Sequence, residues 1–128
     1  MKNSVNSVRL IGNAGMNPVV RQFENGSKVA NLSLATMEGR KDIQGNWVYN
    51  TSWHSLVFRG KQAETVEKMV GKGTKLAIEG KLNHRDYVDK DGQKRYVTEI
   101  IVNELLMLGQ PKNAGKAEVE KAEEPLPF

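Results

Sequence analysis

Residues 47 to 59 form the stretch that most restricts what the chain can fold into. Rich in aromatic and β-branched residues, this stretch reads as one long strand. Side chains alternate between the faces of a strand, so one face carries Trp47, Tyr49, Trp53 and Arg59. The other face, which can join a core, carries Val48, His54, Leu56 and Phe58. Taken alone, the stretch fits a core strand as well as a binding surface.

The composition favours one domain in a reducing compartment. A chain of 128 residues is long enough to bury a core without staples, and it has no cysteine for disulfides or thiolate metal sites. It shows no apolar signal stretch and no run of 18 apolar residues, so we expect a cytoplasmic protein. Residues 1–111 carry 16 Lys and Arg against 11 Asp and Glu. This excess is a mild indication of an anionic partner.

The order of the remaining elements predicts an all-β fold. A single helix is expected at residues 61–70, where apolar side chains recur at helical spacing. Four further strands are expected at residues 5–13, 28–36, 74–88 and 94–108, with an extended segment at 19–23 before an Asn25-Gly26 hairpin turn. The helix then falls between the third and fourth strands, as in the OB-fold, a five-stranded Greek-key barrel. Periodicity alone also permits other small barrels.

The last strand has apolar residues on both faces near its end, and this predicts a contact between subunits. These residues are Ile100, Ile101, Val102, Leu105 and Leu106.

The sequence offers little for catalysis. The two histidines, His54 and His84, have no metal-ligand spacing with a carboxylate, and no nucleophile has a partner. We therefore predict no catalytic residue, no metal and no cofactor, and we expect His54 to be a packed residue.

Two strand faces mix rings with cations, a pattern that favours single-stranded nucleic acid. The first is the face of Trp47 and Trp53 described above. The second is on the strand at 74–88 and carries Lys75, Lys81, Arg85 and Tyr87. Unpaired bases stack on aromatic rings, and the phosphate backbone needs cations alongside. Duplex bases already stack on each other and would not need exposed rings.

Beyond Gly109 the core pattern stops. Residues 110–122 have the composition of a short disordered linker, and residues 123–128 read Glu-Glu-Pro-Leu-Pro-Phe. We therefore expect an OB-fold domain at 1–109, a linker at 110–122 and an acidic tip at 123–128.

An ordered series of short segments spans the chain: Val5–Asn13, Asn17–Pro18, Asn25–Gly26, Val29–Thr36, Trp53–His54, Gly60–Glu64, Lys72–Gly73, Ile78–Leu82 and Asp91–Tyr96. Together they resemble the bacterial single-stranded-DNA-binding proteins, a family of homotetrameric OB-fold proteins, and the Pro-Phe ending resembles that family's acidic tip.

The resemblance implies roles for particular residues. Trp53 and Tyr87 fall on base-stacking positions, and His54 falls near the subunit interface. Basic positions along the strand path correspond to Lys61, Lys72, Arg85 and Arg95. The tip that binds partner proteins corresponds to Glu123, Glu124, Pro125, Leu126, Pro127 and Phe128.

The chain departs from its relatives at Arg40 and Arg59, which stand where aromatic residues are common. Arginine can stack on a base and also carries charge, so these positions would shift binding toward electrostatics. Trp47 and Tyr49 are candidates to compensate for the missing rings, and Lys81 on the strand at 74–88 is a further candidate nucleic-acid-binding residue.

The first hypothesis is a sequence-nonspecific protein that binds and protects single-stranded DNA in replication, recombination and repair. It would be a homotetramer associated with the nucleoid, and its tip would recruit partner proteins. The alternative is a specialised OB-fold relative, of the primosome, plasmid or phage type, that serves mainly in a protein complex. A cold-shock-like RNA-binding barrel is a more distant option.

Overall fold

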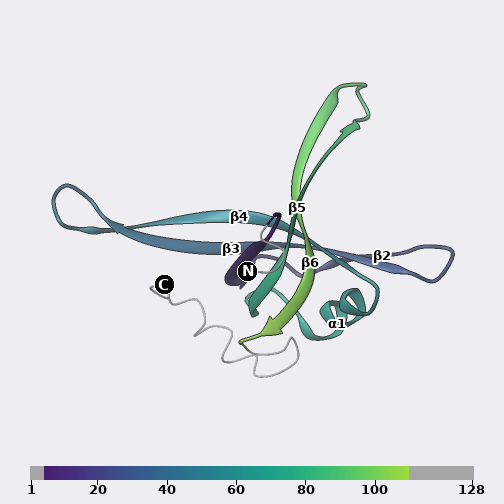
Figure 1. Ribbon diagram of the computed structural model, residues 1–128, viewed down its shortest axis with the longest axis horizontal. Helices are drawn as coiled ribbons and strands as arrows, with labels where there is room; N and C mark the ends of the chain where they lie inside the picture. Colours follow the sequence, from purple (N-terminus) through teal and green to yellow (C-terminus); the bar gives the residue numbers. More distant parts are fainter. Residues whose placement is uncertain (1–4, 110–128) are drawn as a thin grey trace.

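The computed structural model describes residues 5–109 (Figure 1). Its elements, in chain order, are β1 (Val8–Ala14), β2 (Val19–Gln22), β3 (Lys28–Lys41), β4 (Trp47–Arg59), α1 (Lys61–Met69), β5 (Lys75–Val88) and β6 (Lys94–Met107). None of the helices in this part of the chain is long and apolar enough to cross a membrane. The predicted linker at 110–122 and tip at 123–128 lie outside the described residues.

Five of the strands close into a barrel. The strand order is β1-β5-β6-β4-β3-β2, and a further pairing of β1 with β3 closes the sheet. Neighbours are antiparallel except β4 and β6, which run parallel at Leu56–Ile100 and Val57–Ile101. Within residues 5–109, β2 pairs only with β3, so α1 lies between the third and fourth barrel strands, β4 and β5. The predicted OB architecture is thereby confirmed.

The barrel core is aliphatic with one central ring. Phe58, Leu34, Leu56 and Leu76 are fully buried, and Val66 of α1 packs with them. The side-chain alternation of β4 explains why Leu56 and Phe58 point inward together. Beside the core, the Lys28 ammonium donates to Glu67 Oε1 at 3.0 Å and so joins the start of β3 to α1.

Three hairpins extend away from the barrel (Figure 1). The β3–β4 arm and the β5–β6 arm are the far parts of strands whose other ends belong to the core. The strand predicted at 28–36 was too short, because pairing with β4 continues to Lys41–Trp47. Residues 38–41 therefore belong to β3, and only a short turn separates it from β4 at the end of the arm. The strand extends past residue 36 because it pairs with β4, and the sequence of one strand does not show which strand it will pair with.

The three hairpins turn in the same way. Each turn places a glycine at positive φ in its last loop position: Gly26 (88°), Gly45 (86°) and Gly92 (79°). Each glycine N–H donates to the carbonyl three residues earlier, as in the three-residue loops that end in a glycine bulge. The Asn25-Gly26 signal therefore did mark a hairpin, but its loop holds three residues and not two.

Two glycines allow the barrel strands to approach closely. A Cβ on Gly12 would lie 2.2 Å from the Ala35 carbonyl oxygen, where β1 meets β3. A Cβ on Gly80 would lie 2.3 Å from the Ile101 carbonyl oxygen, beside a bulge in the β5–β6 pairing. Beyond this bulge β5 leaves the barrel. Leu82 is accordingly 42% exposed at the start of the arm, although it lies on the same face of β5 as the buried Leu76 and Ile78.

Candidate nucleic-acid interface

The outer face of β4 carries three exposed rings, which we call the ring face: Trp47, Tyr49 and Trp53. Trp53 and Trp47 are 63% and 60% exposed, and Tyr49 is 45% exposed. Their cross-strand partners on β3 are Ala35 for Trp53, Gly39 for Tyr49 and Lys41 for Trp47. The Lys41 Nζ lies 5.6 Å from the centroid of the Trp47 ring, within the range of a cation–π contact.

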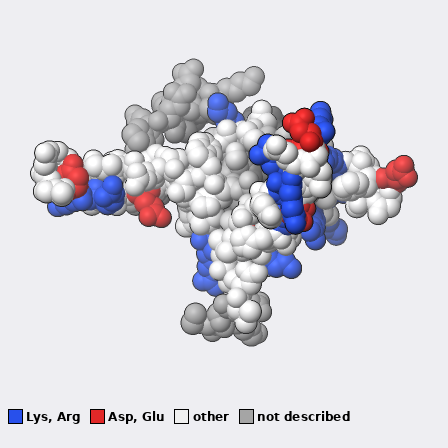
Figure 2. Space-filling model, turned by 90° about the horizontal axis from the view of Figure 1, so that it is seen from above, with Lys and Arg blue, Asp and Glu red and all other residues white. Residues whose placement is uncertain are grey.

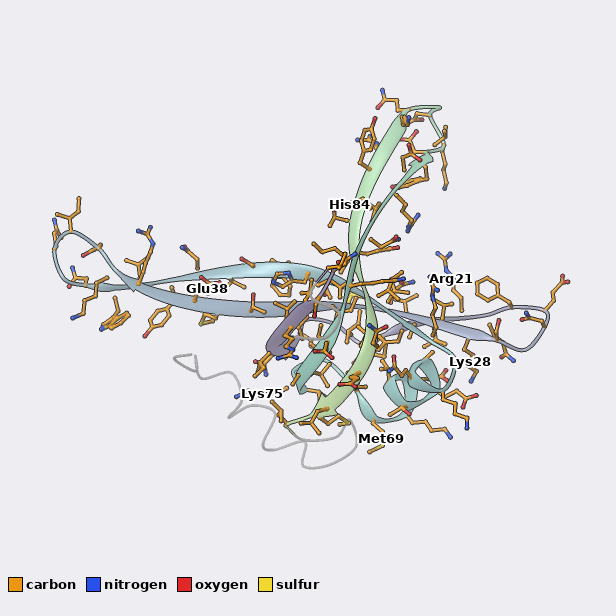
Figure 3. All side chains as sticks on the ribbon, in the orientation of Figure 1. Arg21, Lys28, Glu38, Met69, Lys75 and His84 are labelled. Carbon is orange, nitrogen blue, oxygen red and sulfur yellow. The ribbon has the colours of Figure 1, made fainter. Side chains whose placement is uncertain are left out.

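Geometry alone excludes a core role for these rings. Each of the three is at least 45% exposed, and side chains project from both faces of the β3–β4 arm around Glu38 (Figure 3). Surface of this kind, with large rings next to a cation, suits unstacked bases attached to a charged backbone.

Arg40 and Arg59 are not brought together with the ring face. Arg40 pairs with Val48, so its side chain leaves the opposite face of the arm from Trp47 and Tyr49. Arg59 has the same orientation as Trp53 but lies at the barrel end of β4, beyond the buried Val57. Arg40 and Arg59 therefore stay candidate cations for a nucleic acid, placed apart from the three rings.

A second group of predicted residues lies on one face of the β5–β6 arm. The register pairs Tyr87 with Arg95 and Arg85 with Val97, which places both arginines on the face of Tyr87. The guanidinium carbon of Arg85 lies 5.9 Å from the Tyr87 ring centroid. Lys81 begins the same face at the barrel end.

These arginines already have anionic partners within the protein. Arg85 Nε lies 3.1 Å from Glu99 Oε2, and Arg95 Nε lies 2.9 Å from Asp89 Oδ2. Viewed from above, the end of this arm shows acidic groups directly beside basic ones (Figure 2). A phosphate must therefore compete with a carboxylate for each of them.

Glu99 is a site residue that sequence reasoning missed. It is only 8% exposed, and it accepts hydrogen bonds from Asn83 Nδ2 at 3.0 Å and from Arg85 Nε. Its position opposite Asn83 follows from the pairing of β5 with β6. A Thr-Glu pair at 98–99 in an alternating strand carried no signal for a buried carboxylate.

Tyr96 is another exposed ring that was not assigned. It is 76% exposed on the opposite face of the β5–β6 arm, and Lys94 Nζ lies 5.8 Å from its ring centroid. Lys94 also pairs with Asp86 at 3.2 Å.

The remaining predicted residues lie around the barrel. Lys61 begins α1, and Lys72 lies in the turn before β5, where its backbone N–H donates to Asn17 Oδ1 at 2.9 Å. Both side chains are exposed. His54 is half-buried, and its Nε2 lies 2.8 Å from Thr36 Oγ1, so it is packed as expected. No cluster of three metal-ligating side chains occurs within residues 5–109.

The chain matches known proteins over nearly its whole described length. Residues 5–108 match the single-strand binding protein family. A single-stranded DNA-binding protein 1 of Xylella fastidiosa (strain 9a5c) is 40% identical over 114 residues, covering 88% of this chain and 84% of that protein. A single-stranded DNA-binding protein of Bacteroides thetaiotaomicron is 46% identical over 113 residues, covering 87% of this chain and 70% of that protein.

A solved structure of a single-stranded DNA complex also resembles this chain in fold. A Plasmodium falciparum SSB complex with single-stranded DNA superposes with a TM-score of 0.74 at 30% identity, covering 84% of this chain and 98% of that one.

One ion pair of the β5–β6 arm has a measurable acid dependence. The pKa of Asp89 is lowered from its ordinary 3.8, first by the hydrogen bond from Arg95 and then by the backbone N–H of Gln93. The ionised carboxylate therefore favours the folded turn above pH 3.8, and this contribution is lost as the pH falls through the lower folded pKa. We expect Arg95→Gln to raise the pKa of Asp89 toward 3.8, as measured by an NMR titration of its carboxyl group.

The matched control is Lys94→Gln, which removes a neighbouring cation that pairs with Asp86 and not with Asp89. An equal rise in both variants, or no rise in Arg95→Gln, would contradict the assignment.

The chain forms a closed five-stranded barrel with exposed rings on its arms, and it is 40–46% identical to two named relatives over most of its length. The chain therefore belongs to the single-strand binding protein family, a family of binding proteins and not of enzymes.

Proposed function

We propose that the protein binds single-stranded DNA without sequence preference and protects it in replication, recombination and repair. The observation that carries this proposal is the ring face, with Trp53 as its principal stacking residue and Lys41 beside Trp47. Cations for the phosphate backbone come from Lys61, Lys72, Lys81, Arg85 and Arg95, together with Arg40 on the opposite face of the β3–β4 arm and Arg59 at the barrel end of β4. Relatives named for the same activity support it. Such a protein acts where bacterial DNA lies, in the cytoplasm at the nucleoid.

Binding to a labelled oligo-dT tests the proposal against duplex of equal length. We expect Trp53→Ala to weaken oligo-dT binding by about 1–3 kcal/mol, the contribution of one stacked base. Fluorescence anisotropy measures the affinity. Phe23→Ala is a matched control, because Phe23 is a half-exposed ring at the β2–β3 turn, away from the ring face. Equal affinity for duplex and oligo-dT would overturn the proposed function.

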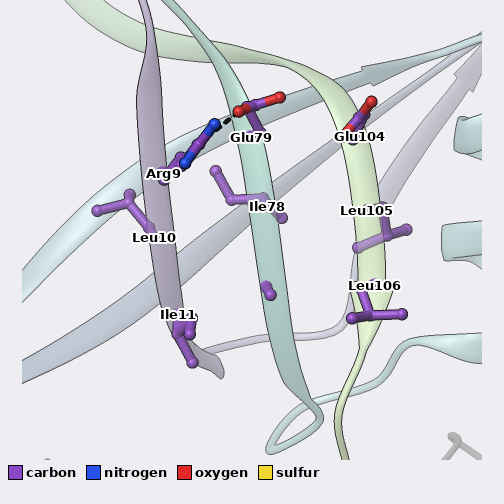
Figure 4. Close-up of a pocket in the computed structure, with 9 residues that line it drawn as sticks. Arg9, Leu10, Ile11, Ile78, Glu79, Glu104, Leu105 and Leu106 are labelled. Atoms are coloured by element: carbon purple, nitrogen blue, oxygen red, sulfur yellow. Dashed lines mark hydrogen bonds and ion pairs between the residues drawn. The ribbon is translucent and has the colours of Figure 1, made fainter. Parts of the chain in front are cut away.

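We also propose that the protein is a homotetramer. The outer surface of β1, β5 and β6 supports this, because Ile11, Ala77 and Leu106 form an apolar row there beside the Arg9–Glu79 ion pair (Figure 4). Ile11 is 52% and Leu106 is 62% exposed in the single chain. In addition, β1 pairs with β3 only from Asn13 onward, so Val8–Gly12 has no second strand partner within the described residues. Exposed strand edges of this kind pair with other chains.

Light scattering of the full chain tests this assembly. We expect a mass of about four chains, and we expect Leu106→Glu to dissociate it because a carboxylate would enter the apolar row. Val88→Glu, at an equally exposed apolar position on the β5–β6 arm, is the control that keeps the assembly. Light scattering of His54→Ala tests whether His54 lies at the subunit interface. We expect this substitution to weaken the tetramer. The mass of a single chain for the unmodified protein would refute the tetramer.

We further propose that residues 123–128 recruit partner proteins of replication, recombination and repair. The support is the sequence itself: two carboxylates, Glu123 and Glu124, precede Pro125, Leu126, Pro127 and a terminal Phe128. An apolar side chain beside acidic groups can enter an apolar pocket with a basic rim.

Removing residues 123–128 tests this role. We expect oligo-dT affinity to stay within about twofold, or about 0.4 kcal/mol, because the proposed DNA contacts lie outside these residues, while affinity capture of replication and repair proteins is lost. Removing residues 113–118 is the control of equal length, and it keeps the tip. Capture that survives loss of the tip would remove this role from it.

A further inference from the structure

Tyr49 is seated on the protein in the same way as Trp53. The Trp53 ring occupies space beside Gly15, where an added Cβ would lie 2.2 Å from Cζ3 of the ring. The Tyr49 ring occupies space beside Gly39, where an added Cβ would lie 2.8 Å from Cε1 and 3.1 Å from Cδ1. Each ring therefore lies directly against glycine backbone and keeps its remaining surface exposed.

The backbone conformation of Gly39 does not require glycine. It lies inside β3, directly opposite Tyr49 in the register, and it is absent from the glycines with positive φ. The atoms nearest to a Cβ there belong to the ring of Tyr49, and Cε3 of Trp47 follows at 3.5 Å, an ordinary contact distance. Glycine within a strand weakens it, so a glycine here is accounted for by the ring that it admits.

The ring face continues in one line along the arm. Tyr49 lies four residues from Trp53 and Trp47 lies six, or about 13 Å and 20 Å along a strand. The three share one face because their spacing is even. Lys41 beside Trp47 supplies a cation at the far end of this line. Rings with a cation are complementary to bases with a phosphate, which identifies the occupant as single-stranded nucleic acid.

We infer that Tyr49 is a second base-stacking residue, that Gly39 is its positioning residue, and that single-stranded DNA runs from Trp53 along the β3–β4 arm to Trp47. This inference rests on the proposed function and adds a path to it. It also explains how bases can stack although positions 40 and 59 carry arginine. The rings come from the arm portion of β4, and not from position 40 in β3 or position 59 at the end of β4.

The test is a double-mutant cycle on the full chain with an oligo-dT of about 16 nucleotides, long enough to span one OB domain. We expect Tyr49→Ala to weaken binding about 5- to 150-fold, as the loss of one stacked base implies. Tyr49→Phe keeps the ring and should bind as the unmodified protein does. Asn50→Ala, on the other face of the arm, is the matched control.

Gly39→Ala should weaken binding only when Tyr49 is present, because its added methyl group displaces that ring. In the Tyr49→Ala background we expect Gly39→Ala to have no further effect. The urea unfolding midpoint is measured for all four members of the cycle, which separates ring placement from fold stability.

Each alternative gives a different result. Unchanged affinity in Tyr49→Ala, or an equal effect of Gly39→Ala in both backgrounds, overturns the inference. A change in assembly mass without a change in DNA affinity would make the ring face a contact between copies, and this also overturns it. Failure of the unmodified protein to bind oligo-dT would refute the proposed function instead.

Discussion

The pairing of β3 with β4 is the constraint on which the interface depends. It runs unbroken from Val29–Arg59 inside the barrel to Lys41–Trp47 at the end of the arm. One register therefore decides both which side chains fill the core and which rings face outward. A slip by one residue would turn Phe58 out of the core and Trp53 into it. The large free energy of burying Leu32, Leu34, Leu56 and Phe58 thus fixes the position of rings that contribute little to stability themselves.

The sequence predicted what depends on local pattern and missed what depends on cross-strand neighbours. The bounds of β4 follow from its aromatic and β-branched composition, and the outward direction of Trp53 follows from alternation. The length of the β3–β4 arm did not follow, because Met37–Lys41 has no strand-like pattern of its own and is extended by its pairing with β4. Likewise the face on which Arg40 lies is decided by its partner Val48, which places it opposite Trp47 and Tyr49.

Charge is the second matter on which sequence and structure differ. Counting basic residues treats every arginine as available to DNA, whereas Arg85 and Arg95 each face a carboxylate brought across by a turn or by strand pairing. Binding a phosphate at such a residue exchanges one ionic partner for another and releases fewer counterions than the count implies. Both carboxylates are also held by other donors: Glu99 accepts from Asn83 Nδ2, and Asp89 accepts from the backbone N–H groups of Asp91 and Gln93.

The topology also has a consequence for the order in which the fold is acquired. The hairpins β2–β3, β3–β4 and β5–β6 join neighbours in sequence and can form in microseconds. Closure requires β1 to reach β5, and β4 to meet β6 in parallel, across long intervening chain segments. Such non-local pairing is the slow step in small barrels. The arms that carry the rings are thus expected to be assembled before the barrel that holds them in place, and during that interval the apolar side of each hairpin is open to the wrong partner.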